Sequence, residues 1–230
     1  RVDHEVHNTI MRKAVVKAQE TIGANRQKMV DELGHWEEWR DLSKQIRNHV
    51  LANLDAYLYQ LSEKVIENGG KVYFAETAEE ASAYIRKVAL EKNAKKIVKS
   101  KSMVTEEIGL NDVLEKEGMQ VIETDLGEYL LQISGDKPSH IVVPAIHKDR
   151  HQIRKDLAER LGYEGEETPE DMTSFVRKKI RQDFLEADIG ISGCNFAVAE
   201  TGSVCLVTNE GNLRLATTLP KTHIAVMGME

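Results

Sequence analysis

Two turns near the end of the chain place carboxylates among small residues and amides. Glu200 lies between two apolar runs, and Glu210 lies in the next turn along the chain. A carboxylate held between apolar strands has either a raised pKa or a fixed partner. Such a group can act as a base, as a nucleophile, or as the acceptor for a substrate hydroxyl. We therefore predict Glu200 and Glu210 as catalytic residues.

The residues around these carboxylates could bind a small acid. Arg214 follows the second turn, and an arginine can clamp a carboxylate through two parallel hydrogen bonds. The predicted substrate-binding residues of this region are Asn195, Thr201, Gly202, Asn209, Gly211, Asn212 and Arg214. The alternative is a plain β-hairpin turn, which explains the glycines and asparagines but not the acids.

A second group of polar residues follows a predicted strand at residues 96–99. Lys99, Ser100 and Lys101 lie between this strand and a helix, where free backbone N–H groups favour anions. We predict these three residues as substrate-binding. The alternative, a helix capped by serine with solvated lysines, is equally open.

Other polar groups are better explained by structure than by chemistry. Thr124, Asp125 and Glu128 are typical helix-capping residues, although their place after a strand also suits the wall of a site. The histidines are interpreted as surface or capping residues, so we predict no metal site in this chain; they are His140, His147 and His151. Cys194 and Cys205 are predicted as core thiols, because cysteine is among the most buried residue types. An iron–sulfur cluster normally takes four thiolates, so two cysteines cannot hold one in the usual way.

Composition narrows the possible partners. The chain has 230 residues, of which 41% are hydrophobic, and its net charge is −7. This acidity argues against nucleic acid, because phosphate binding requires clustered positive charge. No apolar run approaches the roughly 20 residues of a membrane span. The first residues do not resemble a signal peptide, so we expect a cytoplasmic protein.

Strand and helix patterns alternate from residue 71 onward. Such alternation predicts βαβ units around a mostly parallel sheet, with a local antiparallel hairpin at residues 196–207. Further helices are predicted at residues 78–92, 126–133, 149–161 and 169–187, and one or two short helices at residues 106–117. The predicted strands comprise residues 72–75, 96–99, 120–123, 140–143, 189–191, 204–207 and 223–226.

The first 67 residues have helical periodicity and no strand signal. An apolar residue recurs every three or four positions through residues 41–67, which predicts one amphipathic helix. An earlier helix is predicted at residues 4–22, with Trp36 and Trp39 in the link between them. We therefore divide the chain into a helical appendage, residues 1–67, and an α/β domain, residues 68–230.

Several motifs carry a specific resemblance over nearly the whole chain. They are KSKSM, ETDLGEY, HIVVPAIHK, AETGSVCLVTNEGN and RLATTLPKTHIAVMGME. Their order and spacing resemble the lactate-utilisation iron–sulfur subunit family of the LutB type, which carries the LUD domain. One departure is Leu213, where the family pattern would have glycine.

The resemblance implies a three-layer α/β fold similar to the phosphosugar-isomerase and CoA-transferase-like (NagB/RpiA) fold. It also implies a subunit of a complex that oxidises L-lactate to pyruvate, with other lactate-utilisation subunits as partners. A ferredoxin-like segment with two [4Fe–4S] clusters is expected beyond the end of this chain, and no cofactor within it.

Three functions stay open at this point. The first is a redox subunit whose LUD domain binds L-lactate or pyruvate, or contacts partner subunits. Because no GxGxxG fingerprint follows a strand, this domain should not be redox-active by itself. The second is an enzyme like a CoA-transferase or isomerase acting through Glu200. The third is a non-catalytic scaffold that uses the N-terminal helices.

Overall fold

A parallel sheet of four strands organises the C-terminal part of the chain. The computed structural model describes residue 7 and residues 9–136 and 144–229, so the strand predicted at residues 140–143 and His140 lie outside the described residues. The helices are α2 (Thr9–Leu33), α3 (Trp36–Ala52), α4 (Leu54–Glu67), α5 (Ala78–Glu91), α6 (Met103–Glu107), α7 (Leu110–Glu115), α8 (Leu126–Ser134), α9 (Arg150–Leu161), α10 (Pro169–Glu186) and α11 (Asn212–Thr218). The strands are β1 (Lys96–Lys99), β2 (Gln120–Glu123), β3 (Ile189–Ser192), β4 (Phe196–Val198), β5 (Ser203–Cys205) and β6 (Thr222–Ala225).

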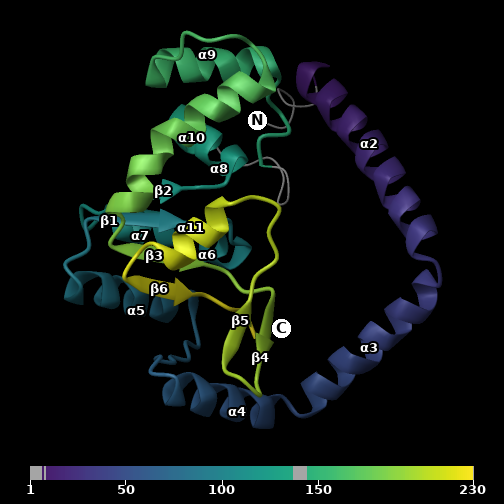
Figure 1. Cartoon of the computed structure of the whole chain (residues 1–230), viewed down its shortest axis with the longest axis vertical. Helices are drawn as coiled ribbons and strands as arrows, with labels where there is room; N and C mark the ends of the chain where they lie inside the picture. Colours follow the sequence, from purple (N-terminus) through teal and green to yellow (C-terminus); the bar gives the residue numbers. More distant parts are fainter. Residues whose placement is uncertain (1–6, 8, 137–143, 230) are drawn as a thin grey trace. The chain divides into compact units, whose positions relative to one another are not determined.

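The sheet has the order β2-β1-β3-β6, and every pairing in it is parallel (Figure 1). Strands β1, β2 and β3 are short and mostly buried, as expected when helices cover both faces of a parallel sheet, whereas the outer strand β6 is only partly covered. Strands β4 and β5 form a separate two-stranded sheet. These observations confirm the predicted α/β class with a mostly parallel sheet.

Alternate residues of the strands supply two hydrophobic cores. Val98 and Ile122 pack with residues of α8, α9 and α10. Their neighbours Ile97 and Val121 point to the other face and pack with residues of α5 and α7. The unit therefore has three layers, with helices on both sides of the sheet (Figure 1).

Helix α11 lies close against β3, and a glycine permits this approach. A Cβ atom on Gly190 would lie 1.7 Å from the backbone oxygen of Ala216. The region after Glu210 was predicted as a turn, but α11 begins at Asn212. Leu213 lies in this helix, and it is not among the residues with positive φ, so a leucine suits the position.

The strand predicted at residues 72–75 is wrong, because this segment is not in a strand. The ring of Tyr73 stacks on Tyr84 of α5, with 3.9 Å between the ring centroids. An aromatic contact with a helix therefore replaces strand pairing, and strand propensity yields readily to such tertiary contacts.

The N-terminal region is helical, but its breaks differ from the prediction. Residues 41–67 were expected as one helix, yet α3 and α4 meet at Asn53, whose side-chain amide donates to the backbone oxygen of His49. This bond competes with the helical backbone pattern. Trp36 and Trp39 lie in the first turns of α3 instead of a link, because Gly34 and His35 at positive φ already separate α2 from α3.

The contacts divide the chain into two compact units. Helices α2 to α4 and residues 197–203 belong to the first unit, and residues 73–196 and 204–230 belong to the second. The predicted boundary after residue 67 stays a prediction. None of the helices in the described part of the chain is long and apolar enough to cross a membrane.

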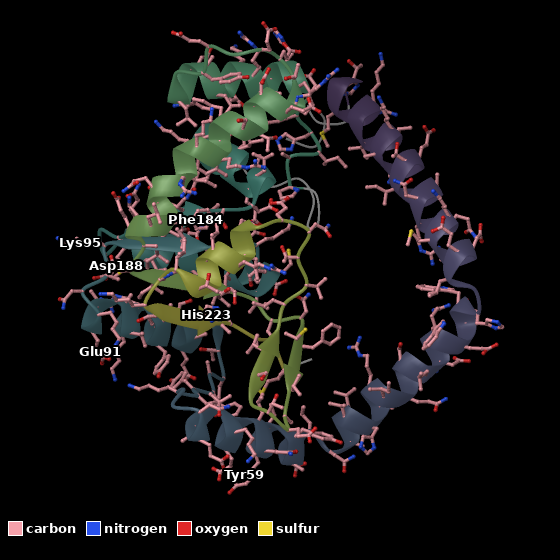
Figure 2. All side chains as sticks on the ribbon, in the orientation of Figure 1. Tyr59, Glu91, Lys95, Phe184, Asp188 and His223 are labelled. Carbon is pink, nitrogen blue, oxygen red and sulfur yellow. The ribbon has the colours of Figure 1, made fainter. Side chains whose placement is uncertain are left out.

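A carboxylate just before β3 accepts hydrogen bonds from the backbone at the amino end of β1. Asp188, next to Lys95 in Figure 2, accepts hydrogen bonds from the backbone N–H groups of Lys95 and Lys96 at 2.8 Å and 3.0 Å. These two bonds hold the pKa of Asp188 below its usual range. The polar residues of interest lie at the other ends of the same strands.

Candidate functional site

A lysine and a glutamate meet at the carboxyl ends of β1 and β2. The register of the two strands places Lys99 beside Glu123, and the Lys99 Nζ atom lies 2.8 Å from Glu123 Oε1. Lys99 is 0% exposed, although lysine is almost never fully buried without a partner. Its ammonium also donates to Thr105 Oγ1 at 3.1 Å, and Glu123 accepts from Asn111 at 2.7 Å.

A second buried glutamate joins this pair. Glu128 lies in the first turn of α8 and is 5% exposed. Its pKa is raised to about 9, mainly by burial and next by the negative charge of Glu123. We call Lys99, Glu123 and Glu128 the buried triad.

Three acceptor oxygens around the triad lack hydrogen-bond partners within the described part of the chain. They are Asn111 Oδ1, Glu123 Oε2 and Glu128 Oε2. Unpartnered buried oxygens are destabilising, and native proteins contain few of them. Two of these oxygens belong to the carboxyl groups of the triad, so its hydrogen bonding depends on whether those groups are protonated.

A second cluster lies at the same edge of the sheet, and we call Lys101, Thr124, Asp125, Glu210 and Asn212 the edge cluster. Asn212 donates to Thr124 Oγ1 at 3.5 Å, and Thr124 donates to the backbone oxygen of Lys99 at 3.0 Å. Glu210 is exposed, but nearby protein atoms displace part of its hydration, and this loss and the charge of Asp125 raise its pKa, while the charge of Lys101 lowers it. Segments far apart in sequence thus meet where β1 and β2 end.

Several predicted site residues have structural roles at this edge. Ser100 is buried, and its N–H donates to the backbone oxygen of Ile191 at 2.9 Å. Ser102 caps α6, and Asp125 caps α8 by accepting from Gly127 and Glu128. Capping therefore accounts for Ser102 and Asp125. The buried Lys99 contradicts the solvated lysines of the alternative interpretation, and substrate binding by Lys99, Ser100 and Lys101 stays a prediction.

Other predicted residues lie on loops of the same unit or, for Arg214, in α11. Asn195 fastens the base of the hairpin, since its Oδ1 accepts from Val207 at 2.8 Å and its N–H donates to Cys205 at 3.1 Å. Asn209, Gly211 and Arg214 are exposed. Their part in substrate binding stays a prediction.

The turn that carries Glu200 belongs to the other compact unit. Glu200 is exposed, so the expectation of a partly buried carboxylate there is wrong. Thr201 accepts from Asn68 at 3.0 Å, and a Cβ on Gly202 would lie 2.6 Å from the Lys64 carbonyl carbon. Close packing against the end of α4 therefore explains these turn residues, and a catalytic role of Glu200 stays a prediction.

Both thiols also lie outside the two cores. Cys194 is partly buried and Cys205 is exposed, which contradicts their prediction as core residues. The hairpin that contains them packs few side chains around its strands, because β4 and β5 are exposed along their length.

Sequence reasoning missed Glu123 and its partners. The signal was present, because both strands end in a charged residue after two apolar ones, KIVK in β1 and QVIE in β2. Only the parallel register shows that Lys99 and Glu123 are neighbours. Thr105 and Asn111 carry no such signal.

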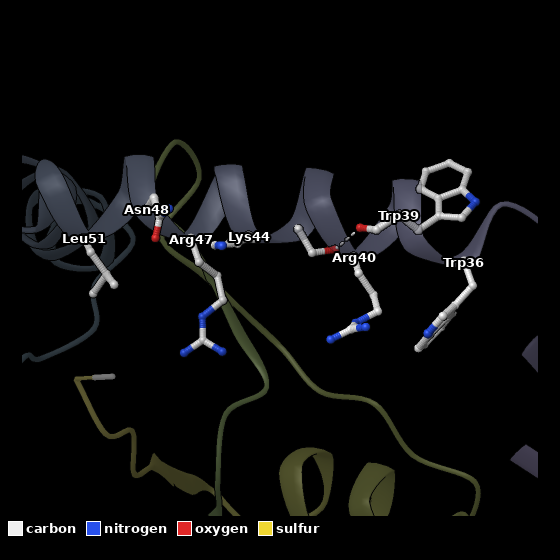
Figure 3. A pocket seen from close by; sticks show the side chains of 8 residues that line it. Trp36, Trp39, Arg40, Lys44, Arg47, Asn48 and Leu51 are labelled. Atoms are coloured by element: carbon white, nitrogen blue, oxygen red, sulfur yellow. Dashed lines mark hydrogen bonds between the residues drawn. The ribbon is translucent and has the colours of Figure 1, made fainter.

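A groove of about 430 Å³ lies elsewhere, along α3 (Figure 3). Its lining is aromatic and basic and includes Trp36, Trp39, Lys44 and Arg47. This groove contains none of the predicted site residues.

Polar residues at the carboxyl ends of parallel strands, between two helical layers, define an α/β protein with the usual location of a ligand site. The LUD domain family matches residues 58–230. This chain belongs to the LUD domain family.

Curated relatives match the whole chain. It is 75% identical over 230 residues to the "Uncharacterized electron transport protein YkgF" of Escherichia coli, covering 100% of this chain and 48% of the relative. It is 63% identical over 231 residues to "Lactate utilization protein B" of Bacillus subtilis, with coverage of 100% and 48%. The Bacillus pumilus protein of the same name is 62% identical, with coverage of 100% and 49%. The chain thus spans about half the length of these relatives, and no solved structure matches it.

Proposed function

We propose that this chain is the LUD-domain part of an iron–sulfur subunit that takes part in the oxidation of L-lactate to pyruvate in the cytoplasm. The observation that carries the proposal is the identity of 62–63% over the whole chain to relatives named for lactate utilisation. The similarity to a relative named as an electron transport protein supports a redox role.

In this proposal the edge cluster, with Arg214, binds a small 2-hydroxy carboxylate. Lys101 and Arg214 supply positive charge for the carboxylate, and Glu210 accepts a hydrogen bond from the hydroxyl. The raised pKa of Glu210 fits a group that exchanges a proton with a ligand. Lys99 contributes indirectly, because its ammonium is paired with Glu123.

The oxidation itself requires an electron acceptor. Two [4Fe–4S] clusters would accept electrons one at a time, and each normally takes four cysteine ligands. This chain has two cysteines, and its described residues contain no group of three or more metal-ligating side chains. The residues present here do not fit such a cluster, so we assign the clusters to a ferredoxin-like segment of the complete protein and propose other lactate-utilisation subunits as partners.

Expression of the complete protein under anaerobic conditions tests the redox role. Iron and acid-labile sulfide should be present in amounts that match two [4Fe–4S] clusters. A product without iron would contradict the assignment as an iron–sulfur subunit.

Ligand titration tests the site separately. L-lactate should bind the complete protein, with D-lactate and acetate as controls for the hydroxyl and its configuration. Glu210→Gln and Arg214→Gln should weaken binding. Glu164→Gln is the matched control, because Glu164 is exposed in the loop before α10. Equal binding by all of these variants would contradict the proposed location.

A further inference from the structure

The buried triad has one feature that capping and ion pairing leave unexplained. It contains one cation and two carboxyl groups, and all three side chains are almost fully buried. If both carboxyl groups were ionised, a net negative charge would be buried, which is strongly unfavourable. The described residues around the triad supply no second cation within ion-pair distance of it.

The unpartnered oxygens point to the same conclusion. Glu123 Oε2 and Glu128 Oε2 are both acceptors without a donor in the described structure. The carboxyl groups of Glu123 and Glu128 lie within hydrogen-bond reach of each other, so a single proton on Glu128 would supply an O–H donor for Glu123. That proton would satisfy two unpartnered oxygens and leave the triad electrically neutral.

We propose that Lys99, Glu123 and Glu128 form a proton-binding site in which Glu128 holds one exchangeable proton and donates it in a hydrogen bond to Glu123. On release the Glu128 O–H bond breaks, the proton passes to water, and the triad gains one negative charge. The triad adjoins the edge cluster, because Thr124 and Asp125 follow Glu123 in sequence and Thr124 donates to the backbone oxygen of Lys99.

The surrounding charges favour retention of this proton. Asp125 caps the helix that carries Glu128, and its negative charge disfavours ionisation of Glu128. Glu115 of α7 adds negative charge near Glu123. Among these groups only the positive charge of Lys99 favours ionisation of Glu128, and Lys99 is already paired with Glu123.

A neutral triad also affects ligand binding at the edge cluster, and this consequence rests on the proposed function. A carboxylate ligand avoids buried negative charge nearby. The affinity for L-lactate should therefore fall as Glu128 loses its proton. Proton and anion bind favourably together, so each should promote the binding of the other.

Infrared spectroscopy of the complete protein tests the proton directly. A protonated carboxylic acid has a carbonyl band that is separate from the carboxylate bands. We expect this band at neutral pH, with loss near the pKa of about 9. Glu128→Gln should remove it, whereas the exposed Glu107→Gln in α6 should leave it unchanged. A wild-type spectrum without the band, or its persistence in Glu128→Gln, would overturn the proposal.

A second variant tests the sharing of the proton. Glu123→Gln removes the neighbouring negative charge while keeping the shape of the side chain, so the acid band should disappear at lower pH than in the wild type. An unchanged midpoint would show that burial alone protonates Glu128, and the triad would not act as a unit.

Lactate titrations at about pH 7 and about pH 10 test the link to the ligand. Binding should weaken severalfold at the higher pH in the wild type but not in Glu128→Gln. An identical pH dependence in both proteins would overturn the link. If lactate binds at neither pH while the acid band behaves as expected, the proposed function fails and the proton site stands.

Discussion

The two compact units differ in which side chains they bury. Helices α3 and α4 contain no buried residue, and Trp39 and Ile46 of α3 are 51% and 55% exposed. The sheet unit, in contrast, buries Lys99, Glu123 and Glu128. Helical periodicity therefore guarantees an apolar face but not a partner for it, whereas a sheet covered on both sides buries even charged residues.

The contrast has a physical cause. Lys99 ends an inner strand, which has neighbours on two sides and helices above and below, so its side chain is surrounded whatever its polarity. A single helix contacts other elements along only part of its surface. Substitutions of buried residues in the sheet unit should therefore change the free energy of unfolding more than substitutions of exposed residues in the helical unit.

Lys99→Met should have the largest effect. It leaves Glu123 buried without its cation, and breaking one side of a buried ion pair destabilises a protein by about 3–5 kcal/mol. Denaturant unfolding of the complete protein measures the change. Lys95→Met, an exposed lysine just before the same strand, should change the unfolding free energy by less than about 0.5 kcal/mol. Similar effects of the two substitutions would show that the burial of Lys99 does not set its contribution to stability.

Glycine-to-alanine changes should have opposite signs in the two units. Gly190→Ala would push a methyl group into the backbone of α11 and destabilise the fold by about 1–3 kcal/mol or more. Gly23→Ala, inside α2 with no atom near the added Cβ, should stabilise the helix by about 0.5–1 kcal/mol. Thermal unfolding measures both changes, and destabilisation by both would contradict the contrast.

Stability should depend on pH through Glu128. Its folded-state pKa of about 9 lies above the ordinary value of 4.5, so the folded protein holds a proton that the unfolded chain releases. This contribution is fully present below about pH 4.5 and is lost as the pH rises through about 9. Glu128→Gln should remove this dependence, as measured by unfolding at a series of pH values. The same decline in both proteins would assign it to other groups.

Ile46→Ala should have the smallest effect. Ile46 is already largely exposed on α3, so truncation should change the unfolding free energy by less than about 0.5 kcal/mol. Ile97→Ala is the matched change in β1, where the side chain is fully buried and about 2–5 kcal/mol should be lost. A large effect of Ile46→Ala on the complete protein would show that its other parts cover this face.

Much of the α/β unit could be predicted because its signals are local. Short apolar runs predicted β1, β2, β3 and β6, and helical periodicity with capping residues predicted α5 and α8 to α10. The strand at residues 72–75 failed because Tyr73 stacks on a helix, a contact that no local pattern shows. Helix α11 was missed because the residues that lead into it, Asn209 to Asn212, have the composition of a turn.

The candidate site was predicted less completely than the fold. The acids and amides around Glu210 and Asn212 were identified, and Asn212 does lie beside Thr124. Glu123 was overlooked, because its importance comes from a register between two strands and not from its neighbours in sequence. Glu200 illustrates the reverse case, since a suggestive turn is exposed in the structure.

The sequence by itself determined the fold class, the family motifs and the edge of the sheet at which polar residues gather, because these depend on local periodicity and on strand ends. Tertiary structure alone decided that Lys99 pairs with Glu123, that Glu128 is buried beside them, and that Glu200 belongs to another unit. The reason is that burial and the pKa of a carboxyl depend on which distant segments surround it, and those neighbours are set by strand register and packing.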